Sequence, residues 1–341
     1  MCIARFASVI AVIASPLWGF EVEGQKTYSV EGATSTLRIL STADEDAFAP
    51  IIEAYQATNP VSVDYTTASS AEVMKAVFEE GATFDLVISS AMDLQTKLAN
   101  DGFAQSYRSV ATDTLPDWAK WRDQVFAFTQ EPAVLVISKA FFAGDVLPRN
   151  RNDLIQMLRD DPERFRGKVG TYDVRTSGLG YLFATQDSRN SESFWRLTEV
   201  MGRLEPQLYC CSGQMISDVA SGKLAFAYNV LGSYTESRLP TTQGIEIAPL
   251  DDFLSVMLRT ALIPKTADNT DAAAAMVDFL VTMNNRAGVV EKSGLPPIDA
   301  QALAANDALR PIRLGPGLLV FLDRLKRESF LRSWSNSIEQ N

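Results

Sequence analysis

The first part of the chain alternates short apolar runs with amphipathic stretches. Residues 37–40 form a run typical of a strand, and the apolar positions of residues 48–55 recur at helical spacing. The same order returns at residues 61–65 and 85–88, each a strand-like run that leads through a polar turn into a helical stretch. Successive strand–turn–helix units predict an α/β fold in which the strands are mainly parallel and the crossovers right-handed.

The second part of the chain repeats this pattern after a break. Residues 125–138 hold two apolar runs separated by Gln130, Glu131 and Pro132, and a proline there suits a crossing segment better than a central strand. We therefore predict two lobes, each a mainly parallel sheet flanked by helices, with a cleft between them that is a favoured place for a ligand. The predicted boundaries are 33–131 with 255–341 for lobe 1, and 132–254 for lobe 2.

The N-terminus has the pattern of a secretory signal peptide. Arg5 precedes an apolar run over residues 6–17, which is shorter than the roughly 20 residues that span a bilayer, and a polar, acidic stretch follows. We assign residues 1–24 to this leader, with cleavage after Gly19 or a few residues later. The alternative is a short buried N-terminal helix. The mature protein is expected to be exported and not embedded in the membrane.

Composition narrows the function classes. The chain has 341 residues, of which 46% are hydrophobic and 21% charged, as in soluble globular proteins. Its formal net charge of −11 disfavours nucleic-acid binding. It contains no histidine, which removes Ser-His-Asp and Cys-His nucleophile systems and the usual zinc ligand sets. We expect neither enzymatic activity nor a cofactor nor a metal site.

Two cysteines stand side by side in the second lobe. Cys210 and Cys211 are too close in sequence to join distant parts of a fold, whereas Cys2 falls in the predicted leader. The pair can form a vicinal disulfide, remain as thiols or bond between chains. The favoured interpretation is that both pack as small apolar side chains, and a soft-metal site is the weaker alternative.

Hydroxyl-rich turns follow the predicted strands. The turns at residues 41–44, 66–70 and 89–93 each lead into a helix, and so does the glycine-rich segment 167–181, which also carries Arg175. In parallel sheets such turns gather at the carboxyl ends of the strands, where ligands bind. Helix starts favour anions because their N–H groups are unpaired and the dipole is positive there. The alternative for each turn is an ordinary capped helix.

Several segments, taken in order, carry a family resemblance over residues 37–300. They read LRILSTADEDAFAPIIEAYQ, FDLVISSAMDL, GKVGTYD with TSGLGY, SGQMISDVASGKLAFAYNVLGSY, and RTALIPKTADNTDAAAAMVDFL followed by SGLPP. In these the chain resembles the periplasmic solute-binding proteins of ABC importers, of the type II fold class. It is most similar to the iron(III)-binding-protein-like group, which also contains binders of sugar phosphates.

The resemblance implies a periplasmic, monomeric protein whose lobes close on a small molecule. The partner would be an ABC transporter permease or, alternatively, a membrane sensor kinase. The ligand would meet these positions: Ser41, Thr42, Ser69, Ser70, Ser89, Ser90, Arg175, Thr176, Ser177, Gly178, Ser212, Gly213, Asn229, Tyr234 and Arg259.

One departure from the family pattern bears on the ligand. Iron(III) binders of the group typically offer paired, often adjacent tyrosines, whereas Tyr228 and Tyr234 are separated here and histidine is missing. Hydroxyls, glycine N–H groups and arginine suit a phosphate or carboxylate instead. We therefore predict a small anionic organic ligand, captured by hinge closure with residues 130–133 and 248–253 as hinge strands. An iron(III) transport protein and an exported α/β enzyme remain the alternatives.

Overall fold

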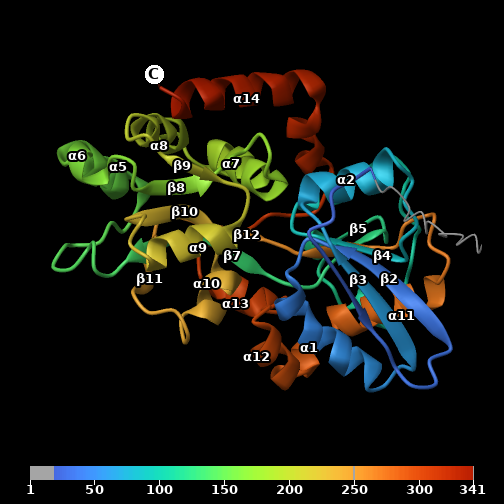
Figure 1. Cartoon of the computed structure of the whole chain (residues 1–341). Coiled ribbons are helices and arrows are strands. Elements are labelled where there is room, and N and C mark those ends of the chain that lie inside the picture. The colour runs from blue at the N-terminus through green and yellow to red at the C-terminus, as the bar shows by residue number, and fades with distance from the viewer. Residues whose placement is uncertain (1–18, 249, 341) are drawn as a thin grey trace, which may run out of the picture.

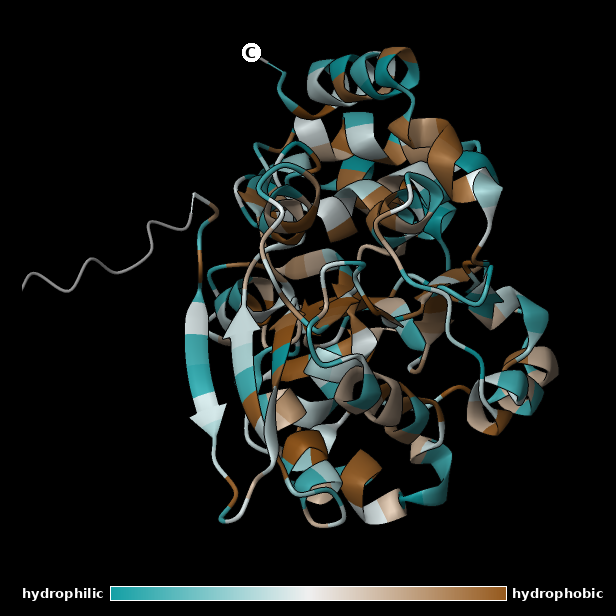
Figure 2. Cartoon of the chain, turned by 90° about the vertical axis from the view of Figure 1, so that its right-hand side faces the viewer, coloured by the Kyte–Doolittle hydropathy of each residue, from teal (hydrophilic) through white to brown (hydrophobic). Residues whose placement is uncertain are grey.

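The protein folds into two α/β lobes that lie side by side (Figure 1). The computed structural model describes residues 19–248 and 250–340. Each lobe contains one mixed sheet flanked by helices, which confirms the predicted two-lobe fold. Figure 2 shows hydrophobic residues concentrated in the interior strands and hydrophilic residues along the outer helices.

The sheet of lobe 1 has the order β1-β3-β2-β4-β13-β6-β5. Its strands are β1 (Gly24–Tyr28), β2 (Ser35–Ser41), β3 (Val61–Thr67), β4 (Leu86–Ser89), β5 (Lys120–Trp121), β6 (Val125–Ala127) and β13 (Thr260–Leu262). β2 pairs in parallel with both β3 and β4, as the strand–turn–helix pattern predicts. β13 returns antiparallel between β4 and β6, so the sheet is mixed rather than parallel throughout.

The helices of lobe 1 pack against this sheet through their apolar faces. Leu37 and Ile39 of β2 belong to the same buried cluster as Phe48 and Ile51 of the first helix. The helical elements of lobe 1 are α1 (Glu45–Gln56), α2 (Ser70–Phe78), α3 (Met92–Asn100), α4 (Val110–Asp113), η1 (Asp117–Ala119), α11 (Thr270–Val281), η2 (Met283–Asn285) and α12 (Ala287–Ser293).

The sheet of lobe 2 has the order β14-β12-β7-β10-β8-β9, with β11 paired to β7 beside this path. Its strands are β7 (Glu131–Ser138), β8 (Val169–Tyr172), β9 (Gln207–Tyr209), β10 (Phe226–Leu231), β11 (Ile245–Ala248), β12 (Leu254–Met257) and β14 (Leu309–Pro311). β8 pairs in parallel with β9 and β10, whereas β7 runs antiparallel to β10.

The remaining helical elements surround the second sheet or join it to the first. They are α5 (Arg151–Asp160), α6 (Pro162–Phe165), α7 (Gly178–Asn190), α8 (Ser193–Gly202), α9 (Ser212–Ala220), α10 (Gly232–Arg238), α13 (Ala300–Ala305), η3 (Pro316–Leu322) and α14 (Arg324–Ile338).

The C-terminal region differs from the predicted boundary. We expected residues 255–341 in lobe 1, but β12 and β14 pair with each other in the second sheet, and α14 lies across lobe 2 (Figure 1). The reason is the apolar face of α14: the Phe330 ring packs 5.5 Å from the ring of Tyr181 and 6.3 Å from that of Phe194, both in lobe 2.

The chain crosses between the sheets at residues 128–130 and 258–259, and a third time between α12 and α13. The first two crossings are paired, since the Phe128 N–H donates to the Arg259 carbonyl at 3.0 Å and the Arg259 N–H to the Thr129 hydroxyl at 3.2 Å. The first crossing overlaps the expected hinge at residues 130–133. The second lies after the expected residues 248–253, because β12 still pairs with β7 in the second sheet.

The first described residues pack on lobe 1. Residues 1–18 of the predicted leader lie outside the described residues, but Phe20 is buried in a core cluster and the Glu23 N–H donates to the Thr67 carbonyl at 2.8 Å. Within residues 19–248 and 250–340, none of the helices combines the length and apolar character needed to cross a bilayer.

Candidate functional site

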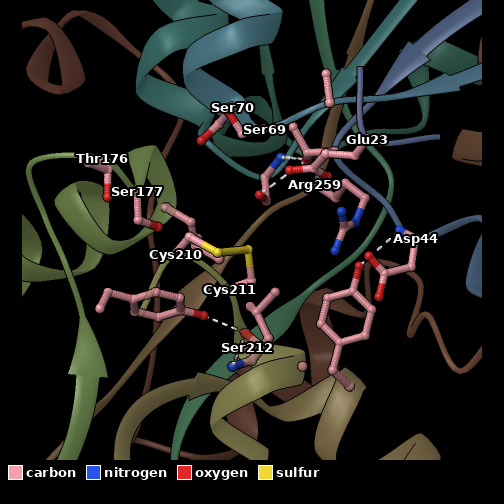
Figure 3. Close-up of a pocket in the computed structure, with 18 residues that line it drawn as sticks. Glu23, Asp44, Ser69, Ser70, Thr176, Ser177, Cys210, Cys211, Ser212 and Arg259 are labelled. Atoms are coloured by element: carbon pink, nitrogen blue, oxygen red, sulfur yellow. Dashed lines mark hydrogen bonds between the residues drawn. A yellow bond between two sulfur atoms is a disulfide. The ribbon is translucent and has the colours of Figure 1, made fainter. Parts of the chain in front are cut away.

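A cavity of about 150 Å³ lies between the lobes, beyond the carboxyl ends of their strands (Figure 3). It collects the turns after β2, β3, β4, β8, β9 and β10, of which the strand pattern predicts the first four. The predicted residues along it are Thr42, Ser69, Ser70, Ser90, Thr176, Ser177, Ser212, Gly213, Tyr234 and Arg259. The lining residues that sequence reasoning did not select are Glu23, Asp44, Ala68, Tyr172, Leu179, Cys210, Cys211 and Leu231.

Two helix starts meet across this cavity. Ser69 caps α2 by accepting from the Glu72 N–H at 3.3 Å, and Ser177 caps α7 by accepting from the Gly180 N–H at 3.1 Å. The two starts are in close contact, since a Cβ added to Gly178 would lie 2.5 Å from the Ser70 Oγ. The positive ends of two helix dipoles therefore point into the same space.

Hydroxyl groups at these helix starts are available to a ligand. Neither the Ser70 nor the Thr176 side chain hydrogen-bonds to any residue that the structure describes. The hydroxyls of Ser69 and Ser177 use their oxygens as caps and keep their hydrogens to donate. These groups together can bind an anion such as a phosphate or carboxylate.

Arg259 brings a buried positive charge to the cavity. Its side chain is 0% exposed, and Nε and Nη2 donate to the two oxygens of Glu131 at 3.0 and 3.1 Å. Burial alone would lower the pKa of Arg259, but the Glu131 carboxylate raises it and the net shift is upward. Among the described residues, the buried Nη1 group has no acceptor.

Two carboxylates line the cavity near Arg259. Burial raises the pKa of Glu23, and the neighbouring Asp44 carboxylate raises it further. The Asp44 N–H donates to the Tyr234 hydroxyl at 3.2 Å, a hydrogen bond that joins the lobes. The sequence analysis did not select Glu23 because this residue falls within the predicted leader. The acidic stretch around it was the only sequence feature that could have indicated a role.

Cys210 and Cys211 form a disulfide on the cavity wall (Figure 3). Both residues are exposed and bonded to each other, so the favoured interpretation, that they pack as small apolar side chains, is wrong, and the alternative of a vicinal disulfide is the one observed. The reason is their position between the end of β9 and the start of α9, where the chain turns at the cleft. Beside them the Ser212 hydroxyl is hydrogen-bonded to the hydroxyl of Tyr172 and accepts a hydrogen bond from the Leu231 N–H at 3.3 Å.

Three of the predicted ligand residues have structural partners close to the cavity. The Ser41 and Ser89 hydroxyls are buried and accept from the N–H groups of Ala43 and Ala91, at 3.0 and 3.1 Å, so they stabilise the turns. Gly178 allows the close approach of α7 to α2 rather than lining the cavity.

Two other predicted residues lie away from the cavity. Arg175 forms a two-pronged ion pair with Asp173, with both distances at 2.8 Å, and donates to Glu339 at 2.5 Å. Asn229 donates to the buried Asp187 at 2.8 Å, within lobe 2. Their charges and donors are used by local and C-terminal carboxylates, so the cleft receives its cation from Arg259 instead of Arg175.

The two tyrosines that the family pattern would use for iron(III) are separated in space. Tyr234 lines the cavity, whereas Tyr228 is buried in lobe 2, where it accepts from Arg151 at 2.6 Å and donates to Asp187 at 2.7 Å. Burial raises the pKa of both phenols. In the described residues, no group of three or more Cys, Asp or Glu side chains is arranged to hold a metal ion.

A family model for bacterial extracellular solute-binding proteins matches residues 37–295. The chain belongs to this family. The match agrees with the resemblance seen in the sequence, and family and fold are those of transport proteins. As a solute-binding protein of the ABC-transporter type, the chain has a small-molecule ligand and a permease as partner. No curated protein matches the chain.

Solved structures resemble this solute-binding protein along nearly its whole length. The substrate-binding protein of an ABC transporter from Agrobacterium tumefaciens has a TM-score of 0.88 and 29% identity, covering 94% of this chain and 99% of that one. AfuA from Actinobacillus pleuropneumoniae, with fructose 6-phosphate bound, has a TM-score of 0.71 and 15% identity, covering 91% and 100%. Iron-bound HitA from Pseudomonas aeruginosa has a TM-score of 0.67 and 16% identity, covering 89% and 99%.

Proposed function

We propose that the protein captures a small hydroxylated organic anion, phosphorylated or carboxylated, in the periplasm and delivers it to an ABC transporter permease. The observation that carries this proposal is the meeting of the α2 and α7 starts at the interlobe cavity. Each start brings a capping serine and a neighbouring hydroxyl that has no partner in the described chain.

The anionic group of the ligand would bind at these helix starts. Each helix dipole stabilises a nearby negative charge by about 0.3–1 kcal/mol, and more where the site is partly buried. Ser69 and Ser70 would donate from lobe 1, and Thr176 and Ser177 from lobe 2. Because the donors come from both lobes, binding an anion between them would favour closure.

The opposite end of the cavity suits hydroxyl groups of the ligand. Glu23 and Asp44 are acceptors there, and the Arg259 Nη1 is a donor. Two carboxylates would repel a second anionic group but accept hydrogen bonds from sugar or polyol hydroxyls. The cavity volume of about 150 Å³ suits a small molecule.

The periplasm is supported by two features. A disulfide persists in an oxidising compartment, and Cys210 and Cys211 are joined in one. The apolar run at residues 6–17 has the form of a leader. We propose that cleavage follows Gly19, because this leaves the buried Phe20 and the cavity-lining Glu23 on the mature protein.

Iron(III) is the competing ligand, since Glu23, Asp44 and Tyr234 bring oxygen atoms to one end of the cavity. The Arg259 guanidinium opposes it. Its central carbon lies 5.8 Å from the centre of the Tyr234 ring, so a trivalent cation bound there would face a buried positive charge.

A thermal-shift screen of the ligand-free mature protein tests the proposal. The compounds are inorganic phosphate, sugar phosphates, phosphoglycerates, di- and tricarboxylates, uncharged polyols and iron(III). A ligand at 100 times its Kd adds about 2.7 kcal/mol to the unfolding free energy, a rise of a few degrees in Tm. Stabilisation by organic anions is the expected result. Stabilisation by iron(III) or by uncharged polyols alone would contradict the proposed ligand class.

A further inference from the structure

The Cys210–Cys211 disulfide occupies a central place in the cavity wall. Cys210 directly follows β9, Cys211 is the N-cap residue of α9, and both are exposed. Figure 3 shows the sulfur bridge between Ser177 and Ser212. The bridge thus lies between the start of α7 and the side of the cavity that carries Ser212.

This disulfide contributes little to the stability of the fold. A disulfide stabilises a protein chiefly by closing a loop in the unfolded chain, and the effect grows with the number of residues in the loop. The bonded cysteines are neighbours, with a sequence separation of 1, so the bridge restricts a single peptide unit. Its effect is local: it fixes the turn between β9 and α9 and holds two sulfur atoms against the cavity.

The sulfur atoms provide an apolar, polarisable surface among polar groups. A disulfide has no N–H or O–H donor, and its sulfurs are weak acceptors that contact C–H groups favourably. Leu179 and Leu231 also line the cavity and extend this apolar part. The nearby Ser212 hydroxyl is already hydrogen-bonded to the Tyr172 hydroxyl and to the Leu231 N–H.

We propose that the Cys210–Cys211 disulfide is a specificity determinant that contacts the carbon skeleton of the ligand. This inference rests on the proposed function and narrows it, because an organic anion has C–H groups that can cover the sulfurs, whereas inorganic phosphate has none. The bridge also selects against soft metals. Cysteine binds metals as the thiolate, and the sulfurs of a disulfide carry no such charge.

The experiment compares two double variants with the wild-type mature protein. C210S/C211S puts hydroxyls in place of the sulfurs, and C210A/C211A keeps an apolar wall without the bridge. Calorimetry measures the Kd of fructose 6-phosphate, 3-phosphoglycerate and inorganic phosphate for all three proteins. We expect the serine variant to weaken each organic anion that the wild type binds by about tenfold, a loss typical of one apolar contact in a pocket. The alanine variant weakens them less, and neither variant changes the affinity for inorganic phosphate.

A second measurement covers the case in which a variant fails to fold. Treating the wild type with a phosphine reductant opens the S–S bond to two thiols: the phosphine supplies two electrons and becomes the phosphine oxide, and water supplies the two protons and the oxygen of that oxide. The same selective weakening of the organic anions is expected. Circular dichroism and Tm check the fold in both arms.

Each other outcome overturns the inference. Unchanged affinity for the organic anions, or equal weakening of all three compounds, removes the disulfide as a specificity determinant and leaves the anion site intact. If the wild type binds only inorganic phosphate and neither organic anion, the disulfide is again removed as a specificity determinant. Binding of none of the three, together with no organic anion stabilising the wild type in the thermal-shift screen, removes the proposed function and this inference with it.

Discussion

Gly178 offers a direct test of closure, because it lies where α7 of lobe 2 touches α2 of lobe 1. A Cβ added there would lie 2.5 Å from the Oγ and 3.1 Å from the Cβ of Ser70, and 3.2 Å from the Cδ1 of Leu94. Carbon contacts are normally about 3.5–4.0 Å apart. Leu94 can turn its side chain away, but the short Ser70 side chain gives little room. Gly178→Ala therefore opposes the closed arrangement of the lobes.

The magnitude follows from the cost of overpacking. Inserting one methyl group into a well-packed contact costs about 1–3 kcal/mol. Because the clash exists only between the lobes, this cost falls on closure and hence on ligand affinity, raising Kd about 5- to 150-fold. The unfolding free energy of the ligand-free, open protein should not fall. It rises by at most about 1 kcal/mol, since alanine favours the helix more than glycine does.

The assay combines calorimetric Kd values, for an anion that stabilises the wild type, with urea unfolding of the ligand-free protein. Gly288→Ala on α12 is the matched control, because an added Cβ there meets no atom within 4 Å. Ser70→Gly supplies the second arm of a double-mutant cycle: Gly178→Ala should lose most of its effect on Kd in that background. An unchanged Kd for Gly178→Ala, or an equal loss in both backgrounds, would refute closure through this contact.

Three further predictions concern the hinge, the pH dependence and the lobe contact. Arg259→Met should lower the unfolding free energy in urea by about 3–5 kcal/mol, because it leaves the Glu131 carboxylate buried without its cation. Adding Glu131→Gln should recover most of this loss. No recovery in the double variant would contradict the charge argument. Burial raises the pKa of Asp93 from 3.8 to about 7, so the folded state keeps a proton that the unfolded state releases. The unfolding free energy should then fall as pH rises from about 4 to 7. Asp93→Asn should raise the unfolding free energy at pH 8 by up to about 4 kcal/mol. If the variant has the same pH profile as the wild type, Asp93 is not the group responsible. Tyr234→Phe removes the hydroxyl that accepts from the Asp44 N–H. It should weaken ligand binding by about 0.5–1.5 kcal/mol, measured by calorimetry. The Tm of the ligand-free protein, measured from a melting curve, should not change.

The strand pattern was sufficient to predict which turns surround the cavity, but not which hydroxyl in each turn faces it. Thr42 and Ser90 line the cavity, whereas Ser41 and Ser89, one residue earlier, are buried caps of the same turns. Successive residues at a strand end point to opposite sides, so a shift of one position exchanges a ligand contact for a structural one. Local spacing alone does not decide between them.

Long-range contacts explain the largest difference between the predicted and the observed site. Arg175 follows a β-strand at a helix start, as an anion-binding arginine would, yet its partners are Asp173 and the distant Glu339 on the C-terminal segment. The sequence contains no local signal that brings residue 339 to this turn. Arg259 was among the predicted residues, but its partner Glu131 became apparent only when the crossing strands were paired.

The buried pair of Arg259 and Glu131 lies where the hinge of the proposed closure would be. Glu131 begins β7 of lobe 2 and accepts from Ser233 of α10, while Arg259 leads into β13 of lobe 1, so the pair lies where the chain crosses between the lobes. In the structure the Nη1 group of Arg259 is buried and finds no acceptor among the described residues. A buried donor without an acceptor costs about 1–3 kcal/mol. We propose that a ligand oxygen accepts from Nη1 and removes this cost, which would favour closure of the lobes by about 5- to 150-fold. On this proposal the arginine at the chain crossing would make closure depend on the ligand, and a permease could then distinguish a loaded solute-binding protein from an empty one.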